Sequence, residues 1–289
     1  MSNPTRYSLA LAVASLTAVS SLHADYMTSS GEITAPENWS AGMFDSSAHP
    51  KTNTRTSTGN KYDLIAGNRN IRLSSGYATF TTLALGAKDS NKSGVSLGIS
   101  GGTLNVSGDL IINQNTTHTA SACTITQSGG QVEIGSALQI GSFPRGNPIG
   151  EASYTISGGS LSAKSINLAI GSEGNEHSFV IEGQAAKSIT SQTDFFAGGG
   201  DHTGFNNIVF KLGANGITPL EIKGKLFSDS STEYIVDGSI YKGGPQAIVL
   251  ATYKGVSSTS ATQTIQNFSN GLNATLKFGT NELTLVILP

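Results

Sequence analysis

The sequence predicts an all-β protein that folds as a right-handed parallel β-helix, a solenoid of short stacked coils. The first observation is a Ser-Gly-Gly motif that occurs three times, beginning at Ser100, Ser128 and Ser157. The spacings of 28 and 29 residues (128 − 100 and 157 − 128) form a fixed period, which indicates stacked repeats. The second observation is the alternation of apolar and polar residues on both sides of each motif, which is typical of β-strands.

Each repeat is expected to form three strands. The first strand precedes the glycines, the second follows them, and the third lies a few residues further on. Glycine suits the corner between the first two strands because a sharp turn requires a positive φ, which glycine adopts without steric cost. The core positions that this alignment predicts are Leu104, Val132 and Leu161 in one column of the second strand, Val106, Ile134 and Ala163 in another, and Leu110, Ile112, Leu138, Ile140, Ile166 and Leu168 in the third strand.

The repeat loses its regularity towards both ends, as expected for a solenoid whose terminal coils would otherwise expose unpaired backbone. We therefore divide the chain into a signal peptide at 1–24, an N-terminal cap at 25–70, the repeats at 71–229 and a C-terminal β cap at 230–289. Within the last segment, alternating residues flank Gly279-Thr280-Asn281, and this pattern predicts a β-hairpin.

The first 24 residues have the composition of a secretory signal peptide. Arg6 precedes an apolar stretch from Tyr7 to Leu22, and Ala24 supplies a small residue at the expected cleavage position. Serines and a threonine interrupt the stretch, so a signal peptide is favoured over a membrane anchor. We expect a protein that is secreted or held at the cell surface, with no membrane span in the mature chain.

Composition excludes some functions. Charged residues make up 12% of the chain and the net charge is −2, with none of the basic sequence clusters that nucleic-acid binding requires. The only cysteine, Cys123, excludes an intramolecular disulfide. Because Cys123 alternates with Ile125, it is predicted to point into the core.

Three longer segments, 113–122, 142–152 and 172–177, lie between the third strand of one coil and the first strand of the next. Because coils stack in register, these segments are expected to emerge along one edge of the solenoid. Loops on a rigid scaffold are common binding sites, so any partner is expected at this edge.

Residues that could carry chemistry are few. Glycosidic cleavage needs two ionisable groups held close together, or a metal and a base. The charges on the predicted coils are Asp109, Glu133, Lys164, Glu182 and Lys187, which lie at unmatched positions, and the loops add Arg145 and Glu151. We therefore predict no catalytic residues.

Other motifs have simpler structural explanations. Ser100 lies in a Gly-x-Ser-x-Gly pattern, but no helix is predicted after it, as a hydrolase nucleophile would require. His118, His177 and His202 are expected to be solvated loop histidines rather than metal ligands. Gly198-Gly199-Gly200-Asp201 is a single imperfect copy of a motif that binds calcium only in tandem. No metal or cofactor is predicted.

The repeats resemble those of a known group of proteins. The segments that carry the resemblance are Trp39-Ser40, 78–86, 101–110, 126–130 and 154–159. They are similar to the bacterial secreted β-solenoid repeat proteins of the autotransporter-associated and PEP-CTERM-sorted type. The resemblance implies an extracellular or surface location and an adhesin-like role, and it supplies no catalytic residues.

Three hypotheses on function follow. The first is a non-enzymatic extracellular or cell-surface scaffold, adhesin-like, that contacts polysaccharide or envelope components along the loop edge. The alternative is a polysaccharide lyase or glycoside hydrolase built on a parallel β-helix. A glycan-binding module would need a row of outward aromatics, for which Phe143 and Phe195-Phe196 are the candidates.

Overall fold

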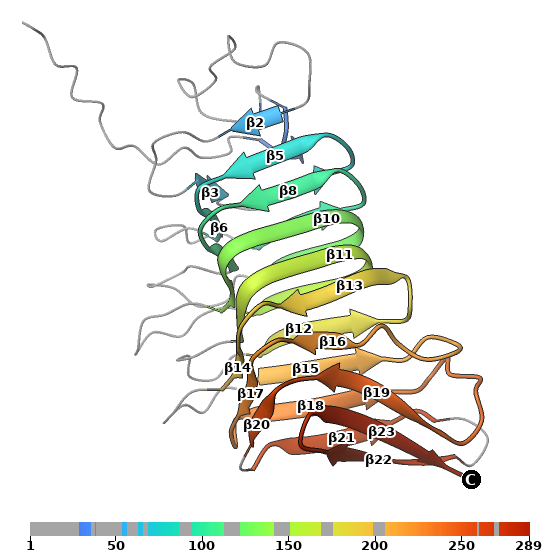
Figure 1. Ribbon diagram of the computed structural model, residues 1–289. Coiled ribbons are helices and arrows are strands. Elements are labelled where there is room, and N and C mark those ends of the chain that lie inside the picture. Colours follow the sequence, from blue (N-terminus) through green and yellow to red (C-terminus); the bar gives the residue numbers. More distant parts are fainter. Residues whose placement is uncertain are drawn as a thin grey trace, which may run out of the picture.

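The structure is a computed structural model, and it describes residues 29–35, 38, 54–56, 63–65, 69–86, 94–112, 122–141, 151–168, 176–198, 206–258, 260–268 and 272–289. These residues form strands and turns and no α-helix. The strands stack along one axis as a right-handed parallel β-solenoid (Figure 1). The fold class that the repeat predicts is therefore confirmed.

Each coil has three strand positions, and each position forms a parallel ladder from coil to coil. The first position contains β1 (Gly31–Glu32), β4 (Arg69–Leu73), β7 (Val95–Ile99), β12 (His177–Glu182), β15 (Asn206–Lys211), β18 (Thr232–Asp237) and β21 (Thr262–Gln266). The second contains β2 (Thr54–Thr56), β5 (Tyr77–Phe80), β8 (Thr103–Val106), β13 (Ala186–Ser191), β16 (Leu220–Ile222) and β19 (Gln246–Thr252). The third contains β3 (Asp63–Ile65), β6 (Leu83–Leu85), β9 (Leu110–Ile112), β14 (Phe195–Ala197), β17 (Lys225–Ser228) and β20 (Gly255–Ser258).

Two long strands run through all three positions of a coil, namely β10 (Cys123–Ile140) and β11 (Ala152–Leu168). Their register shifts between Ser128 and Gln131 and again between Ile134 and Ala137, which marks the two corners. At the first corner the second glycine of each pair has a positive φ, +69° at Gly130 and +76° at Gly159. A positive φ is the reason for which glycine was predicted at this corner.

The predicted core columns are confirmed. Val132 pairs with Leu104 in the coil before and with Leu161 in the coil after, and Ile134 pairs in the same way with Val106 and Ala163. All six side chains are buried. Cys123 is also buried, in the column that begins the first strand. The interior is one continuous apolar cluster along the axis, because a single coil cannot bury its own apolar face and packs on its neighbours.

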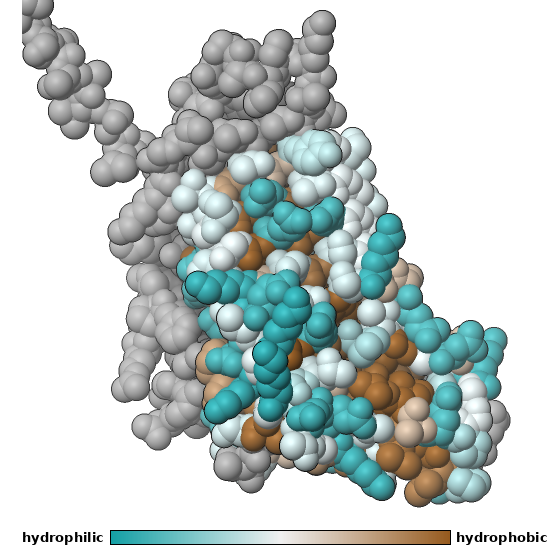
Figure 2. Space-filling model, in the orientation of Figure 1, coloured by the Kyte–Doolittle hydropathy of each residue, from teal (hydrophilic) through white to brown (hydrophobic). Residues whose placement is uncertain are grey.

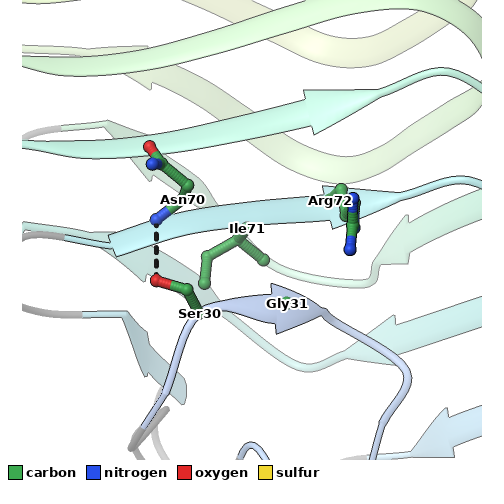
Figure 3. Close-up of a pocket in the computed structure, with 5 residues that line it drawn as sticks. All are labelled: Ser30, Gly31, Asn70, Ile71 and Arg72. Atoms are coloured by element: carbon green, nitrogen blue, oxygen red, sulfur yellow. Dashed lines mark hydrogen bonds between the residues drawn. The ribbon is translucent and has the colours of Figure 1, made fainter.

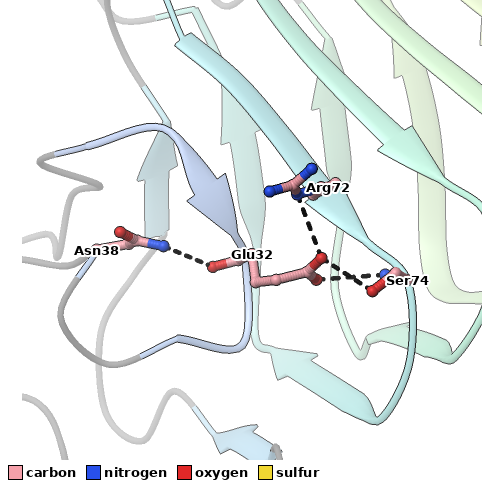
Figure 4. Close-up of polar contacts among 4 residues, drawn as sticks. All are labelled: Glu32, Asn38, Arg72 and Ser74. Atoms are coloured by element: carbon pink, nitrogen blue, oxygen red, sulfur yellow. Dashed lines mark hydrogen bonds and ion pairs between the residues drawn. The ribbon is translucent and has the colours of Figure 1, made fainter.

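Parallel stacking extends beyond residues 71–229 at the N-terminal side. Strands β1, β2 and β3 pair in parallel with β4, β5 and β6, and so occupy the positions of one more coil. Side chains reinforce this junction: the Glu32 carboxylate accepts hydrogen bonds from the Ser74 hydroxyl (2.9 Å) and backbone N–H (3.3 Å) and pairs with Arg72 Nε at 3.4 Å (Figure 4).

Stacking also extends on the C-terminal side, where β18, β20 and β21 pair in parallel with the coils before them. The predicted hairpin is confirmed as β22 (Asn273–Phe278) and β23 (Glu282–Leu288). Strand β23 pairs antiparallel with β19, so the chain direction reverses and parallel stacking ends there. Phe278 packs edge-on against buried Tyr234, with ring centroids 5.1 Å apart, and thereby covers this end of the core.

Candidate functional surface

The ionisable residues singled out from the sequence lie on different parts of the solenoid. Asp109 lies at the corner before the third strand, Glu133 on the second strand and Glu182 at the end of the first. Lys187 is exposed on β13, and Lys164 is exposed at the corner between the second and third positions of β11. The fold does not gather these five residues into one site.

Their carboxylates take part in contacts that support the coils. Asp109 accepts hydrogen bonds from the backbone N–H of Ala137 (2.9 Å) and from Gln139 Nε2 (3.0 Å), both in the next coil. Glu133 accepts one from Gln131 Nε2 at 2.6 Å. Glu182 pairs with Lys211 at 2.7 Å, directly across the ladder. Asp109 and Glu182 thus link neighbouring coils, whereas the exposed contact of Glu133 lies within one strand.

The expectation of solvated loop histidines is wrong for His177. This residue begins strand β12 and points into the core, in register with Ala152 before it and Asn206 after it. Burial lowers the pKa of His177 from 6.5 to about 4, because the charged imidazolium loses its hydration. His118 and His202 lie outside the described residues.

The remaining motifs show no chemical site. Ser100 follows β7 and leads into strand β8, so the strand-to-helix turn of a hydrolase nucleophile does not form there. Gly198 ends the described part of the glycine-aspartate segment, and 199–201 lie outside it. Across the described ranges, histidine, cysteine, aspartate and glutamate side chains form no group of three or more that could hold a metal ion.

A small cavity lies at the junction of β1 and β4. Its volume is about 310 Å³, and it is lined by Ser30, Gly31, Asn70, Ile71 and Arg72 (Figure 3). The Asn70 backbone N–H donates to Ser30 Oγ at 3.1 Å within it. The polar groups at this junction mainly join the first coil to the second, and Arg72 also pairs with Glu32.

The outer faces carry polar side chains in register. On the second-strand face one column runs through Thr79, Asn105, Glu133, Ser162, Thr190, Glu221 and Thr252. On the first-strand face another column runs through Ser96, Thr124, Ser153 and Ser178 to Asn207, which is buried, as Thr190 is in the first column. Figure 2 shows the side on which the second strands lie, with many hydrophilic residues and an apolar patch near the C-terminal end over β19 and β23. Leu288, 46% exposed, belongs to β23.

Sequence reasoning missed an aromatic pair on the third-strand face. Phe195 is buried in the core, whereas Phe196 points outward and stacks on Phe227 of the next coil, with ring centroids 4.7 Å apart and planes 5° from parallel. Both rings are partly exposed. The signal in the sequence was weak, because the two residues are 31 positions apart (227 − 196) rather than 28 or 29. Phe143 lies outside the described residues.

The edge at which binding was expected begins at the third-strand ends. Ile112, Ile140, Leu168 and Ala197 lie in register there, so these strand ends form one line along the solenoid. Residues 113–121, 142–150 and 172–175 of the three longer segments lie outside the described residues. The part of the chain that the structure describes contains no helix long and apolar enough to cross a membrane.

Comparison with known proteins gives no match: no protein-family model, no curated protein and no solved structure is similar to this chain.

Proposed function

We propose that this protein is an exported, non-enzymatic β-helix scaffold with an adhesin-like role at the bacterial cell surface or outside the cell. It contacts extracellular polysaccharide or envelope components along the loop edge, at which its third strands end, and along the polar face that its second strands form. The proposal combines the predicted signal peptide, which lies outside the described residues, with the geometry of the solenoid surface.

The observation that carries the proposal is the polar column of the second-strand face. Seven polar residues, from Thr79 to Thr252, repeat once per coil, all at least partly exposed except the buried Thr190, and neighbouring coils are about 4.8 Å apart. Hydroxyl, amide and carboxylate groups at this spacing form a long, regular surface that can hydrogen-bond a polymer along its length. Such a surface suits attachment to a polymer more than catalysis at a single glycosidic bond.

The contacts of the carboxylates favour a scaffold over a polysaccharide lyase or hydrolase. A glycosidase holds two carboxyl groups about 5–10 Å apart across the scissile bond. Asp109, Glu133 and Glu182 instead occupy different faces, and each accepts hydrogen bonds from its own or an adjacent coil. The charges of the coils therefore support the fold.

Export can be tested with the full chain in a bacterial host. We expect the product in the extracellular or surface fraction, accessible to added protease, with an N-terminus at Asp25. An uncleaved product that remains in the cytoplasm would contradict the proposal.

Binding and catalysis are tested on the exported product. We expect retention on immobilised polysaccharides, with no release of reducing ends or unsaturated sugars from pectin or alginate. Turnover that disappears in Glu151→Gln or Arg145→Gln would favour the enzyme instead.

A further inference from the structure

Three lysines gather at one corner of the solenoid, between the second and third strand positions. Lys223 and Lys225 lie on either side of Gly224, and the Lys254 backbone N–H donates to the Gly224 carbonyl at 2.8 Å from the next coil. All three side chains are exposed. Among the described residues, ion pairs form at Arg72 and Lys211 and at none of these three lysines.

The carboxylates that the structure describes at this corner form no ion pair with the three lysines. Asp194 Oδ1 accepts a hydrogen bond from the backbone N–H of Lys225 at 2.7 Å, so it contacts the main chain rather than an ammonium group. Two further carboxylates lie beside the corner: Glu221, which accepts a hydrogen bond from the Thr190 hydroxyl at 3.3 Å, and Glu282, which lies in register with Thr252. Because none of the three exposed ammonium groups is held in an ion pair with a described residue, all three can pair with the charges of an anionic partner.

The aromatic pair lies beside the lysines. On strand β17, Lys225 and Phe227 alternate with the buried Leu226 and so share the outer face. Phe196 covers one face of the Phe227 ring. The residue in register on the other side is Ser257, which is small and exposed, so the aromatic stack ends at Phe227.

We propose that Phe196, Phe227, Lys223, Lys225 and Lys254 form a binding site for an acidic polysaccharide built of uronic acid units. The apolar face of one pyranose ring packs on the Phe227 ring above Ser257, and carboxylates of the same and neighbouring units pair with the lysines. The inference rests on the proposed role in glycan contact, and it names the class of glycan and its site.

The chemistry of a polyuronate matches both features of the surface. Its ring C–H groups suit a flat aromatic face, and its regularly spaced carboxylates suit a group of ammonium ions. Because the lysines are exposed, their attraction is screened by salt, and affinity should fall as ionic strength rises.

The test measures binding of polygalacturonate and of alginate oligomers to the exported full chain at two salt concentrations. We expect Phe227→Leu to weaken binding roughly tenfold, the range of one lost stacking contact, because leucine fills the strand position without a flat ring. Phe227→Trp should retain binding. The triple variant Lys223→Gln, Lys225→Gln, Lys254→Gln should lose most of the affinity and its salt dependence.

Matched controls lie elsewhere on the surface. Tyr77 is a 59% exposed aromatic on β5, and Lys277 is an exposed lysine on β22. Tyr77→Leu and Lys277→Gln should leave polyuronate binding unchanged. Circular dichroism and thermal melting of each variant show that lost binding is not lost folding.

Four results would overturn the site. One is unchanged polyuronate affinity in both Phe227→Leu and the triple variant. The second is equal weakening by the control substitutions, which would indicate diffuse attraction. The third is tighter binding of single-stranded DNA with the same sensitivity to the variants. The fourth is binding of neutral dextran by the wild-type chain and equally by the variants, with no binding of polyuronates. That result would contradict the proposed site but would agree with the proposed role in glycan contact.

Discussion

The phenolic hydroxyl of Tyr154 donates a 2.6 Å hydrogen bond to Oε1 of Gln127 in the coil before it, inside the core of the solenoid. Both side chains are fully buried, and Gln127 Nε2 in turn donates to the Ser160 carbonyl at 2.9 Å. Burial raises the pKa of Tyr154 well above its ordinary value, so its hydroxyl remains a donor. The three groups link two coils at the Ser-Gly-Gly corner.

Tyr154→Phe should lower the free energy of unfolding by about 1–3 kcal/mol. The substitution removes the donor and leaves Gln127 Oε1 buried without this hydrogen bond, and an unsatisfied buried acceptor carries that cost. Urea denaturation followed by circular dichroism measures the change.

The double variant Tyr154→Phe with Gln127→Leu provides the control for coupling. If the hydrogen bond joins the two residues, the double variant should lose about 1 kcal/mol less than the sum of the single losses. Strictly additive losses would show that the two side chains act independently.

Val132→Asp should be severely destabilising, by about 4 kcal/mol or more, or should prevent folding. Val132 is buried between Leu104 and Leu161, so the new carboxylate would lose its hydration without a partner. Thr126→Asp is the matched control because Thr126 is exposed on the same strand. Thermal melting within a degree or two of wild type for Val132→Asp would contradict the observed register.

Gly159→Ala should lower stability by more than about 2 kcal/mol. Its φ of +76° disfavours a side chain, and a Cβ there would lie 2.2 Å from the Gly130 carbonyl oxygen of the neighbouring coil. Gly244→Ala is the control, because no atom lies within 4 Å of a Cβ built there. Equal unfolding midpoints in urea for the two variants would contradict this explanation of the corner.

Stability should fall as the pH drops from about 6.5 towards about 4. His177 has a folded-state pKa of about 4, lowered by burial from 6.5, so in this range the unfolded chain binds a proton that the folded chain does not. The complete loss is about 3 kcal/mol. It is measured as the free energy of unfolding in urea at a series of pH values.

His177→Asn tests the origin of that pH dependence. Asparagine does not titrate and already occupies the next position of this column, at Asn206. The variant should lose the wild-type slope between pH 4.5 and 6.5, whatever its absolute stability. A slope equal to that of wild type would assign the effect to other groups.

The repeats predicted the central coils well because each coil there has nearly the same length. When coil length is constant, equal positions in sequence become neighbours in space, and Val132 could be placed between Leu104 and Leu161 without coordinates. The hairpin at β22 and β23 was predictable for a similar reason, because its strands are adjacent in sequence and joined by a short turn.

Where coil length changes, sequence spacing no longer identifies neighbours. Phe196 and Phe227 stack across a spacing of 31 residues (227 − 196). The corner from Thr252 to Gly255 is one residue shorter than the corresponding corner from Glu221 to Lys225, and it places Lys254 beside Gly224, between Lys223 and Lys225. His177 was assigned to a loop because the repeat is irregular there, yet its pairing with Ala152 and Asn206 makes it a core residue.

The sequence by itself determined the period, the three-strand coil and the inward positions, because alternation and glycine corners are local properties of the chain. Tertiary structure alone decided which surface residues meet. Outward side chains have no burial to constrain their pattern, so only the register between coils of unequal length brings Phe227, Lys225 and Lys254 together.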